Sequence, residues 1–469
     1  MKLFLVIFGR NRISPTCMHK YLLILLFVSC GTHAQKDSAF IRKIYDETLL
    51  RGKAHEDLRS LCKDVGARIS GSAAAEMAVY WSEAKMKSYG FDKVYLQEIQ
   101  VPHWERGTKE NAYFKDDKGI LYKVKVLALG GSIATEGAIE AEVVEFTSLD
   151  ALKKATRSQV EGKIVFINQL MDAAQISTFR AYGACWPVRG LGAIEGSNLG
   201  AKAVVIRSLA MPIDDHPHTG SMYYVDSVAK IPAAALSTKD CELLSAQLKK
   251  GKCKFILEMN CQNFPDETSY NIIAEMTGTK FPNEIITFGG HIDSWDTGEG
   301  AHDDGAGVIH NLEALRVLKT LNYKPNHTLR LVFFMNEENG NMGGKTYATW
   351  TKAKGEKQIA AIESDRGGFS PRGFDVDGQD KHLDLLKSFA PLFALYFVNQ
   401  FEKGYGGVDI GPLKDEFDGI PLFGFAVDSQ RYFDFHHAES DVFENVNKRE
   451  LELGAASIGA LIYLLDQKL

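Results

Sequence analysis

Four short clusters of histidine and acidic residues follow directly after apolar runs of this 469-residue sequence. The first, GGHIDSWDTGEGAHDDGAGV, contains His291, Asp293 and Asp303 and leads into a helical pattern. Imidazole and carboxylate are the ligands that zinc takes when cysteine is not used. Asp293 stands two residues from His291, on the same side of an extended strand, where its carboxylate could accept the second imidazole N–H. The first cluster therefore predicts part of a metal site.

A pair of adjacent carboxylates, Glu337 and Glu338, follows the apolar strand of the second cluster, LRLVFFMNEENGNMGG. Two like charges at the end of an apolar run are costly unless a cation neutralises them. Because adjacent side chains point in different directions, one glutamate can bind a metal while the other faces water as a general base. The pair therefore predicts a catalytic metal site.

The third and fourth clusters are AAIESDRGG, with Asp365, and RYFDFHHAESD, with His436, His437 and Asp441. We expect the aromatic run of the fourth cluster to be extended, so that only one of its adjacent histidines can face a metal. We expect Asp441 to shape the turn that carries this histidine. Together the four clusters offer more ligands than one tetrahedral zinc uses, which favours two metals bridged by a carboxylate.

The elements around these clusters must bring four distant parts of the chain together. Apolar β runs occur in NIIAEMTG, EIITFGGHID, HTLRLVFFMNEE and QIAAIESD, and a helical pattern, HNLEALRVLKTL, separates the second from the third. This alternation predicts an α/β sheet with helices on both faces, in which functional groups gather at the carboxyl ends of strands. From about Gly130 to Pro265, short β runs and glycine-rich turns predict a separate small module, as the chain length also suggests.

The order GGHxDSWDxGxGAxDDGxG, EE, ESD, HHxxxD resembles the co-catalytic zinc exopeptidases, the family that contains zinc aminopeptidases and carboxypeptidases of the Q type. VPHWERG, SGS, GKIVFIN and KIPAAALS extend the resemblance over nearly the whole chain. It implies a zinc-peptidase domain with a mixed β-sheet flanked by helices on both faces, and a smaller β-rich protease-associated domain inserted into it. We expect residues 36–127 and 266–469 to form the first domain and residues 128–265 the second.

The resemblance also implies a role for each residue of the site, with two zinc ions per chain. The ligands would be the bridging Asp303, His291 and Asp365 on one ion, and Glu338 and His437 on the other. Glu337 would be the general base, with Asp293 and Asp441 supporting the ligands. His437 is preferred to His436 because it precedes Asp441 by the four residues of the family motif. The peptide bond between Asp303 and Asp304 would be cis.

The implied reaction is hydrolysis of dipeptides or short peptides with a free amino terminus, by attack of a dizinc-bound hydroxide with Glu337 as base. Two alternatives stay open: an inactive binding or receptor-like relative, and a one-zinc acyltransferase or cyclase of the same superfamily. The absence of a GxSxG motif argues against a serine hydrolase. The segment ACWPVRGLGAIEGSNLG departs from the family pattern, so the resemblance does not predict which peptides are cleaved. It implies a homodimer.

The net charge of -6 gives no reason to expect nucleic acid or an anionic membrane as partner. The apolar run YLLILLFV, followed by small residues, predicts a signal peptide over residues 1–34, with cleavage after Ala34 or lipidation at Cys30. No later run of about 20 apolar residues predicts a membrane span. We therefore expect export to a secreted, periplasmic or cell-surface location.

Five cysteines remain after the predicted signal peptide, an odd and scattered set that does not resemble a disulfide framework. None has the CxxC spacing of a cysteine zinc site, so we expect buried thiols. Cys253 and Cys261 are the only close pair that could form a bridge.

Overall fold

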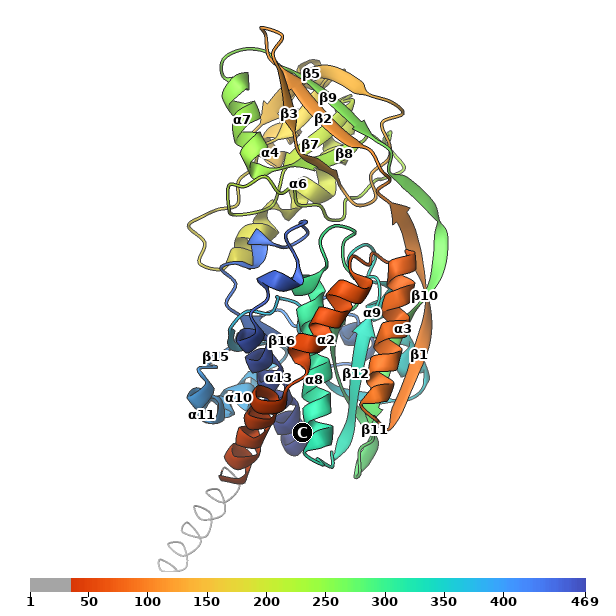
Figure 1. Ribbon diagram of the computed structural model, residues 1–469, viewed down its shortest axis with the longest axis vertical. Coiled ribbons are helices and arrows are strands. Elements are labelled where there is room, and N and C mark those ends of the chain that lie inside the picture. Colours follow the sequence, from red (N-terminus) through yellow and green to blue (C-terminus); the bar gives the residue numbers. More distant parts are fainter. Residues whose placement is uncertain (1–34) are drawn as a thin grey trace, which may run out of the picture.

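The computed structural model describes residues 35–469, in which two eight-stranded sheets lie one above the other in the view of Figure 1. The predicted signal peptide, with Cys30, lies outside the described residues. The lower sheet belongs to the unit with the four clusters, here called the peptidase unit, and the upper sheet to the inserted unit. The expected α/β class, with a mixed sheet flanked by helices, is confirmed.

The sheet of the peptidase unit has four parallel strands at its centre, β12, β11, β13 and β16, and β10 and β14 join them in antiparallel fashion. Its strands, in spatial order, are β1 (Lys93–Glu105), β10 (Gln262–Met276), β12 (His327–Phe334), β11 (Phe281–His291), β13 (Lys357–Glu363), β16 (Leu422–Val427), β14 (Pro371–Asp377) and β15 (Gln400–Lys403). Because the central strands are parallel, their carboxyl ends share one edge, and each cluster follows one of them.

Helices cover both faces of this sheet, because alternate residues of each central strand point to opposite sides. On β12, Leu331 and Phe333 belong to the core that includes α2 (Ala54–Ser60), α3 (Ala73–Ser88), α8 (Ala306–Thr320) and α13 (Lys448–Lys468). Val332 and Phe334 belong to the opposite core, with α9 (Met342–Ala353) and α12 (Leu413–Glu416). Residues 35–51 are also helical, as are α10 (Asp380–Ser388) and α11 (Ala390–Phe393).

The inserted unit is a second mixed sheet with helices on both faces. Its strands, in spatial order, are β3 (Leu121–Val124), β2 (Glu110–Lys115), β9 (Lys254–Met259), β5 (Ile139–Phe146), β6 (Ile164–Ile167), β7 (Ala203–Arg207), β8 (Ala233–Leu236) and β4 (Val126–Ala128). Its helices are α4 (Leu149–Lys153), α5 (Arg157–Val160), α6 (Thr178–Asn198) and α7 (Thr238–Leu248). The parallel strands β5 to β8 form its centre.

The two units are joined by a long antiparallel ribbon of β1 and β10, whose register runs from Lys93 opposite Glu275 to Glu105 opposite Gln262. Strands β2 and β3 precede the boundary that we expected at residue 128 and β4 crosses it, yet all three pair within the second sheet. Alternation in LYKVKVLAL predicts strands but not the sheet that they join. We therefore propose that the inserted unit starts near Glu110 and ends near Met259.

The segment that departs from the family pattern forms most of α6, a helix of 21 residues that contains Pro187. Its glycines bring the helix close to the sheet. A Cβ atom on Gly196 would lie 2.6 Å from a methyl of Val204, and one on Gly192 would lie 3.1 Å from a methyl of Ile167. The close packing places the amino-terminal half of α6 over the edge where the four clusters end.

The five cysteines of the described part of the chain are buried and free, so Cys253 and Cys261 do not form the bridge that their spacing allowed. Among residues 35–469, every helix falls short of the length and apolar character that crossing a membrane requires.

We predict opposite effects of the same substitution at two positions of α6. Gly183→Ala places a methyl in open space and should stabilise the protein by about 0.5–1 kcal/mol through helix propensity. Gly196→Ala forces the helix away from Val204 and should destabilise by about 1–3 kcal/mol. Denaturant unfolding of both variants measures the difference, and equal effects would contradict the packing of α6.

Candidate active site

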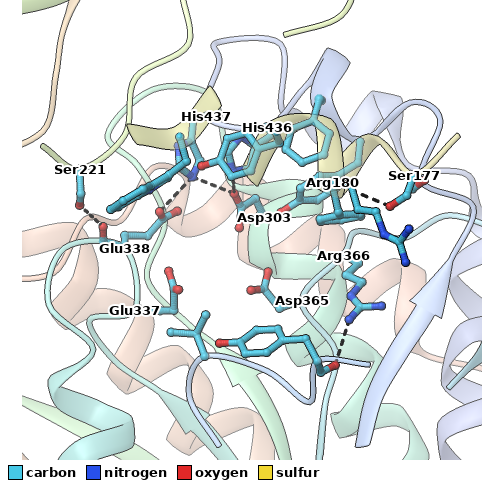
Figure 2. Close-up of a pocket in the computed structure, with 18 of the residues that line it drawn as sticks. Ser177, Arg180, Ser221, Asp303, Glu337, Glu338, Asp365, Arg366, His436 and His437 are labelled. Atoms are coloured by element: carbon cyan, nitrogen blue, oxygen red, sulfur yellow. Dashed lines mark hydrogen bonds and ion pairs between the residues drawn. The ribbon is translucent and has the colours of Figure 1, made fainter. Parts of the chain in front are cut away.

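The four clusters meet at the carboxyl edge of the peptidase sheet (Figure 2). β11 ends at His291, and Glu337, Asp365 and His437 lie on the segments that follow β12, β13 and β16. Asp303 comes from the loop between β11 and α8. The topology thus brings together residues that lie up to 146 positions apart, His291 and His437 being the extremes.

Asp303 lies at the centre of the cluster, and its two carboxylate oxygens face different groups. Oδ1 is 3.3 Å from Nε2 of His291, which in turn is 3.6 Å from Oδ1 of Asp365. Oδ2 is 3.2 Å from Nε2 of His437, which in turn is 3.1 Å from Oε2 of Glu338. A single carboxylate therefore connects two groups of potential metal ligands.

Both adjacent histidines approach Asp303, so the expectation that only one can face the metal site is wrong. The chain is not extended here, because Tyr432–Asp434 forms a 3-10 helix and His437 has a φ of 62°. The two imidazole rings stack with centroids 3.5 Å apart, and Nε2 of His436 lies 3.5 Å from Oδ2 of Asp303. Two sets of three residues each bring their ligand atoms within 4.8 Å of one another. One set is Asp303, His436 and His437, and the other is His291, Asp303 and Asp365.

Asp293 supports the glutamates and not the imidazole. Nδ1 of His291 donates to the backbone carbonyl of Asp293 at 3.0 Å, whereas the carboxylate is 3.7 Å away. That carboxylate accepts the backbone N–H groups of Asn336, Glu337 and Glu338 at 2.8, 3.1 and 3.3 Å. It therefore fixes the turn that carries both glutamates, while the carbonyl leaves Nε2 of His291 facing the carboxylates.

The loop that carries Asp303 is held by two other buried charges. Asp441 accepts the backbone N–H groups of His302 and Asp303 at 2.7 and 3.1 Å, so its carboxylate supports Asp303 instead of the turn of His437. Arg68, which is fully buried, donates to carbonyl groups of the segment just before this loop, at 2.5 to 3.0 Å. The peptide bond from Asp303 to Asp304 is cis, as expected.

An excess of buried negative charge dominates the electrostatics of the site. Burial raises the pKa of Asp441 to about 7, and burial with the neighbouring Asp365 raises the pKa of Glu363 to about 8. Burial alone would lower the pKa of His437, but Glu338 and Asp303 raise it to about 9. Each shift reflects carboxylates that a nearby cation would stabilise in their charged form.

The donor set fits zinc. Within residues 35–469, Oδ2 of Asp303 and Oε1 of Glu338 are buried without a hydrogen-bond donor, a condition that costs about 1–3 kcal/mol for a polar atom. A metal ion would satisfy both atoms. Imidazole nitrogens and carboxylate oxygens without sulfur form a ligand set that zinc commonly takes.

A cavity of about 1570 Å³ opens over these side chains, and both units line it. Small-molecule sites usually have about 300–1,000 Å³, so this one has room for a peptide. From the inserted unit, the wall includes four aromatic side chains, Phe179, Tyr182, Trp186 and Tyr223. From the peptidase unit, the wall includes Glu337, Asp365, Arg366, Arg372 and His436.

The contribution of the inserted unit was missed by the sequence analysis. Thr219 offers its backbone carbonyl to Nδ1 of His437 at 3.1 Å, and the hydroxyl of Ser221 donates to the backbone carbonyl of Glu338. Every residue type has a backbone carbonyl, so the sequence does not mark the one that acts as acceptor here. Asp409 was missed as well, because it follows a glycine-rich loop and not a strand; its carboxylate is buried near that of Glu363.

Comparison with known proteins agrees with this geometry. The profile of Peptidase family M28 matches residues 271–461, the part that carries all four clusters. Carboxypeptidase Q of Bos taurus is 35% identical over 418 residues, which cover 88% of this chain and 85% of the relative. The chain belongs to peptidase family M28. The resemblance to the zinc exopeptidases is thereby confirmed, and the chain is a zinc metallopeptidase.

Solved M28 structures share the fold of this peptidase. An M28 peptidase precursor from Shewanella amazonensis has a TM-score of 0.88 and 32% identity, covering 92% of this chain and 97% of its own. A zinc aminopeptidase from Bacillus subtilis has a TM-score of 0.62 at 21% identity, covering 87% and 94%. The arrangement of both units is therefore one that other M28 peptidases adopt.

We predict that Asp293→Asn lowers kcat/KM of this peptidase by about 10–100-fold, because an amide offers one acceptor oxygen to a turn that now uses two. The fold should persist, as judged by circular dichroism and thermal unfolding. Unchanged kcat/KM would show that the turn of Glu337 and Glu338 does not depend on Asp293.

Proposed function

We propose that this M28 peptidase hydrolyses dipeptides or short peptides with a free amino terminus, using two zinc ions and Glu337 as general base. The observation that carries the proposal is the position of Asp303, whose two oxygens each face a different histidine and its acidic neighbour. A carboxylate shared in this way is what a two-metal site requires.

The proposed ligands divide into two groups around the shared Asp303. One group has His291 and Asp365, and the other has Glu338 and His437. We prefer His437 to His436 because its Nε2 faces two carboxylates, while its Nδ1 is engaged by Thr219. When bound, the zinc ions supply Lewis acidity that activates water and polarises a peptide carbonyl.

Glu337 is suited to the transfer of a proton. It lines the cavity beside the ligands, and burial, opposed by His291, raises the pKa of its carboxyl well above the ordinary value. A general base acts best when its pKa lies near the working pH. In the proposed reaction the Glu337 carboxylate takes a proton from the attacking water and passes it to the departing amine.

The rival functions lack a matching observation. A binding protein without chemistry would not need Glu337, which lines the cavity and is not among the proposed metal ligands. A one-zinc acyltransferase or cyclase would not need the second group of ligands around Asp303. We also propose export through the signal peptide at residues 1–34, which the apolar run YLLILLFV supports, and assembly as a homodimer, which the family resemblance implies.

We predict a division of roles between the two adjacent glutamates. Glu337→Gln should keep the zinc content near that of the wild type and lower kcat by about two to four orders of magnitude, the usual contribution of a general base. Glu338→Gln should lose zinc instead. Elemental analysis and steady-state kinetics on both variants test this, and equal zinc loss in both would refute the assignment.

We predict that peptides with a free amino terminus are cleaved and that N-acetylated analogues are cleaved at least about tenfold more slowly. The two-metal site offers the free amine a Lewis-acid partner, which the acetylated nitrogen cannot use. Kinetics on matched dipeptides with and without the acetyl group give the ratio. Equal rates would rule out exopeptidase action from the amino end.

A further inference from the structure

A short segment of the inserted unit, residues 218–221, lies against the second group of ligands in the peptidase unit. The N–H of Thr219 donates to the backbone carbonyl of His437 at 3.0 Å, and Nδ1 of His437 donates back to the carbonyl of Thr219 at 3.1 Å. The hydroxyl of Ser221 donates to the backbone carbonyl of Glu338 (Figure 2). Two proposed ligands from separate strand ends are thus contacted by one segment of another unit.

The contact to His437 decides how its ring can act. Nδ1 of His437 has two polar neighbours, the carbonyl of Thr219 at 3.1 Å and Nη1 of Arg189 at 3.4 Å. With Nε2 as the proposed zinc ligand, the hydrogen of the neutral imidazole sits on Nδ1, where the carbonyl is the neighbour that can accept it. Its Nε2 then presents a lone pair toward Asp303 and Glu338, which lie 3.2 and 3.1 Å away. Partners of this kind orient metal-binding histidines and typically contribute a factor of 10–100 in metal affinity.

Arg189, on α6, holds the segment in place. The side chain is buried, and its Nε donates to the carbonyl of Ser221 at 3.2 Å, while Nη1 lies 3.4 Å from the carbonyl of Thr219 and 3.4 Å from Nδ1 of His437. The guanidinium also lies over the ring of Tyr182, at 5.5 Å from its centroid. Between the two carbonyls, Gly220 has a φ of 136°, and a Cβ there would come within 2.3 Å of the guanidinium carbon.

We infer that the inserted unit completes the metal centre without supplying a ligand: Arg189 is a positioning residue that, through residues 219–221, orients His437 and Glu338 toward the zinc ion that they share. The inference rests on the proposed two-zinc function and deepens it. It explains why α6 and the 218–221 loop, although far from the peptidase sheet in sequence, close over one side of the site.

Other contacts between the units hold them together without involving a ligand. The hydroxyl of Thr178, also on α6, donates to the carbonyl of Ser429 at 2.7 Å. Loss of this bond removes one hydrogen bond between the two units. The contacts between Arg189 and residues 219–221 remain. Thr178→Val is therefore the matched control for any variant that acts through the segment.

The test compares Arg189→Met, Gly220→Ala and Thr178→Val with the wild type in the full mature chain. Zinc bound per chain and the zinc dissociation constants are measured without substrate by competition with a chelator, so that contacts of Arg189 with a peptide cannot contribute. Arg189→Met should raise the dissociation constant of one of the two zinc ions by about 10–100-fold, and added zinc should restore part of the lost kcat. Gly220→Ala, which keeps the arginine but displaces it, should do the same.

Thr178→Val should keep both zinc affinities. If Arg189→Met and Gly220→Ala retain wild-type affinity for both ions, or if Thr178→Val weakens zinc as much as they do, the inference is overturned and the proposed function still stands. A wild-type chain that binds a single zinc would overturn the proposed function and this inference together.

Discussion

The burial of carboxylates around Asp303 is the constraint on which the rest of the site depends. Glu337, Glu338 and Asp365 lie in a low-dielectric edge of the sheet around Asp303, and His291, His436 and His437 are the histidines that approach Asp303 there. Such a group is stable in its charged form only if cations neutralise it. In the proposed site, the same excess of charge that would destabilise a protein without metal would give this peptidase its affinity for zinc, and one set of side chains would link stability to catalysis.

Several of the other buried acids meet this constraint by a different route, since backbone N–H groups surround them. Asp293 receives three from the turn after β12, and Asp441 receives two from the loop of Asp303. Glu363 receives two from the loop that carries Asp409. Each of these carboxylates ties a loop to the sheet, so charge-assisted hydrogen bonds help to fix the loops that present the proposed ligands.

The sequence was sufficient for the strands and for the residues that follow them, because apolar runs that end in acids mark the carboxyl edge of a parallel sheet. It was not sufficient for the local path of the chain at His436 and His437, where a single residue with positive φ turns both rings the same way. Helix α6 carries too many glycines for its apolar pattern to stand out. The role of Thr219 depends on its backbone carbonyl, which no side-chain pattern marks, so it becomes visible only in the folded structure.

The ribbon of β1 and β10 has a consequence for the order in which the chain can fold. Glu105 and Gln262, which bracket the inserted unit, are direct neighbours in the ribbon. During synthesis β1 cannot pair with β10 until the whole insertion has left the ribosome. Closing a long flexible loop costs more entropy than closing a short one, so an insertion that folds first brings the two strands together at lower cost. An inserted unit that folds first would act as a folded spacer, and the peptidase sheet would then acquire its edge strand after it.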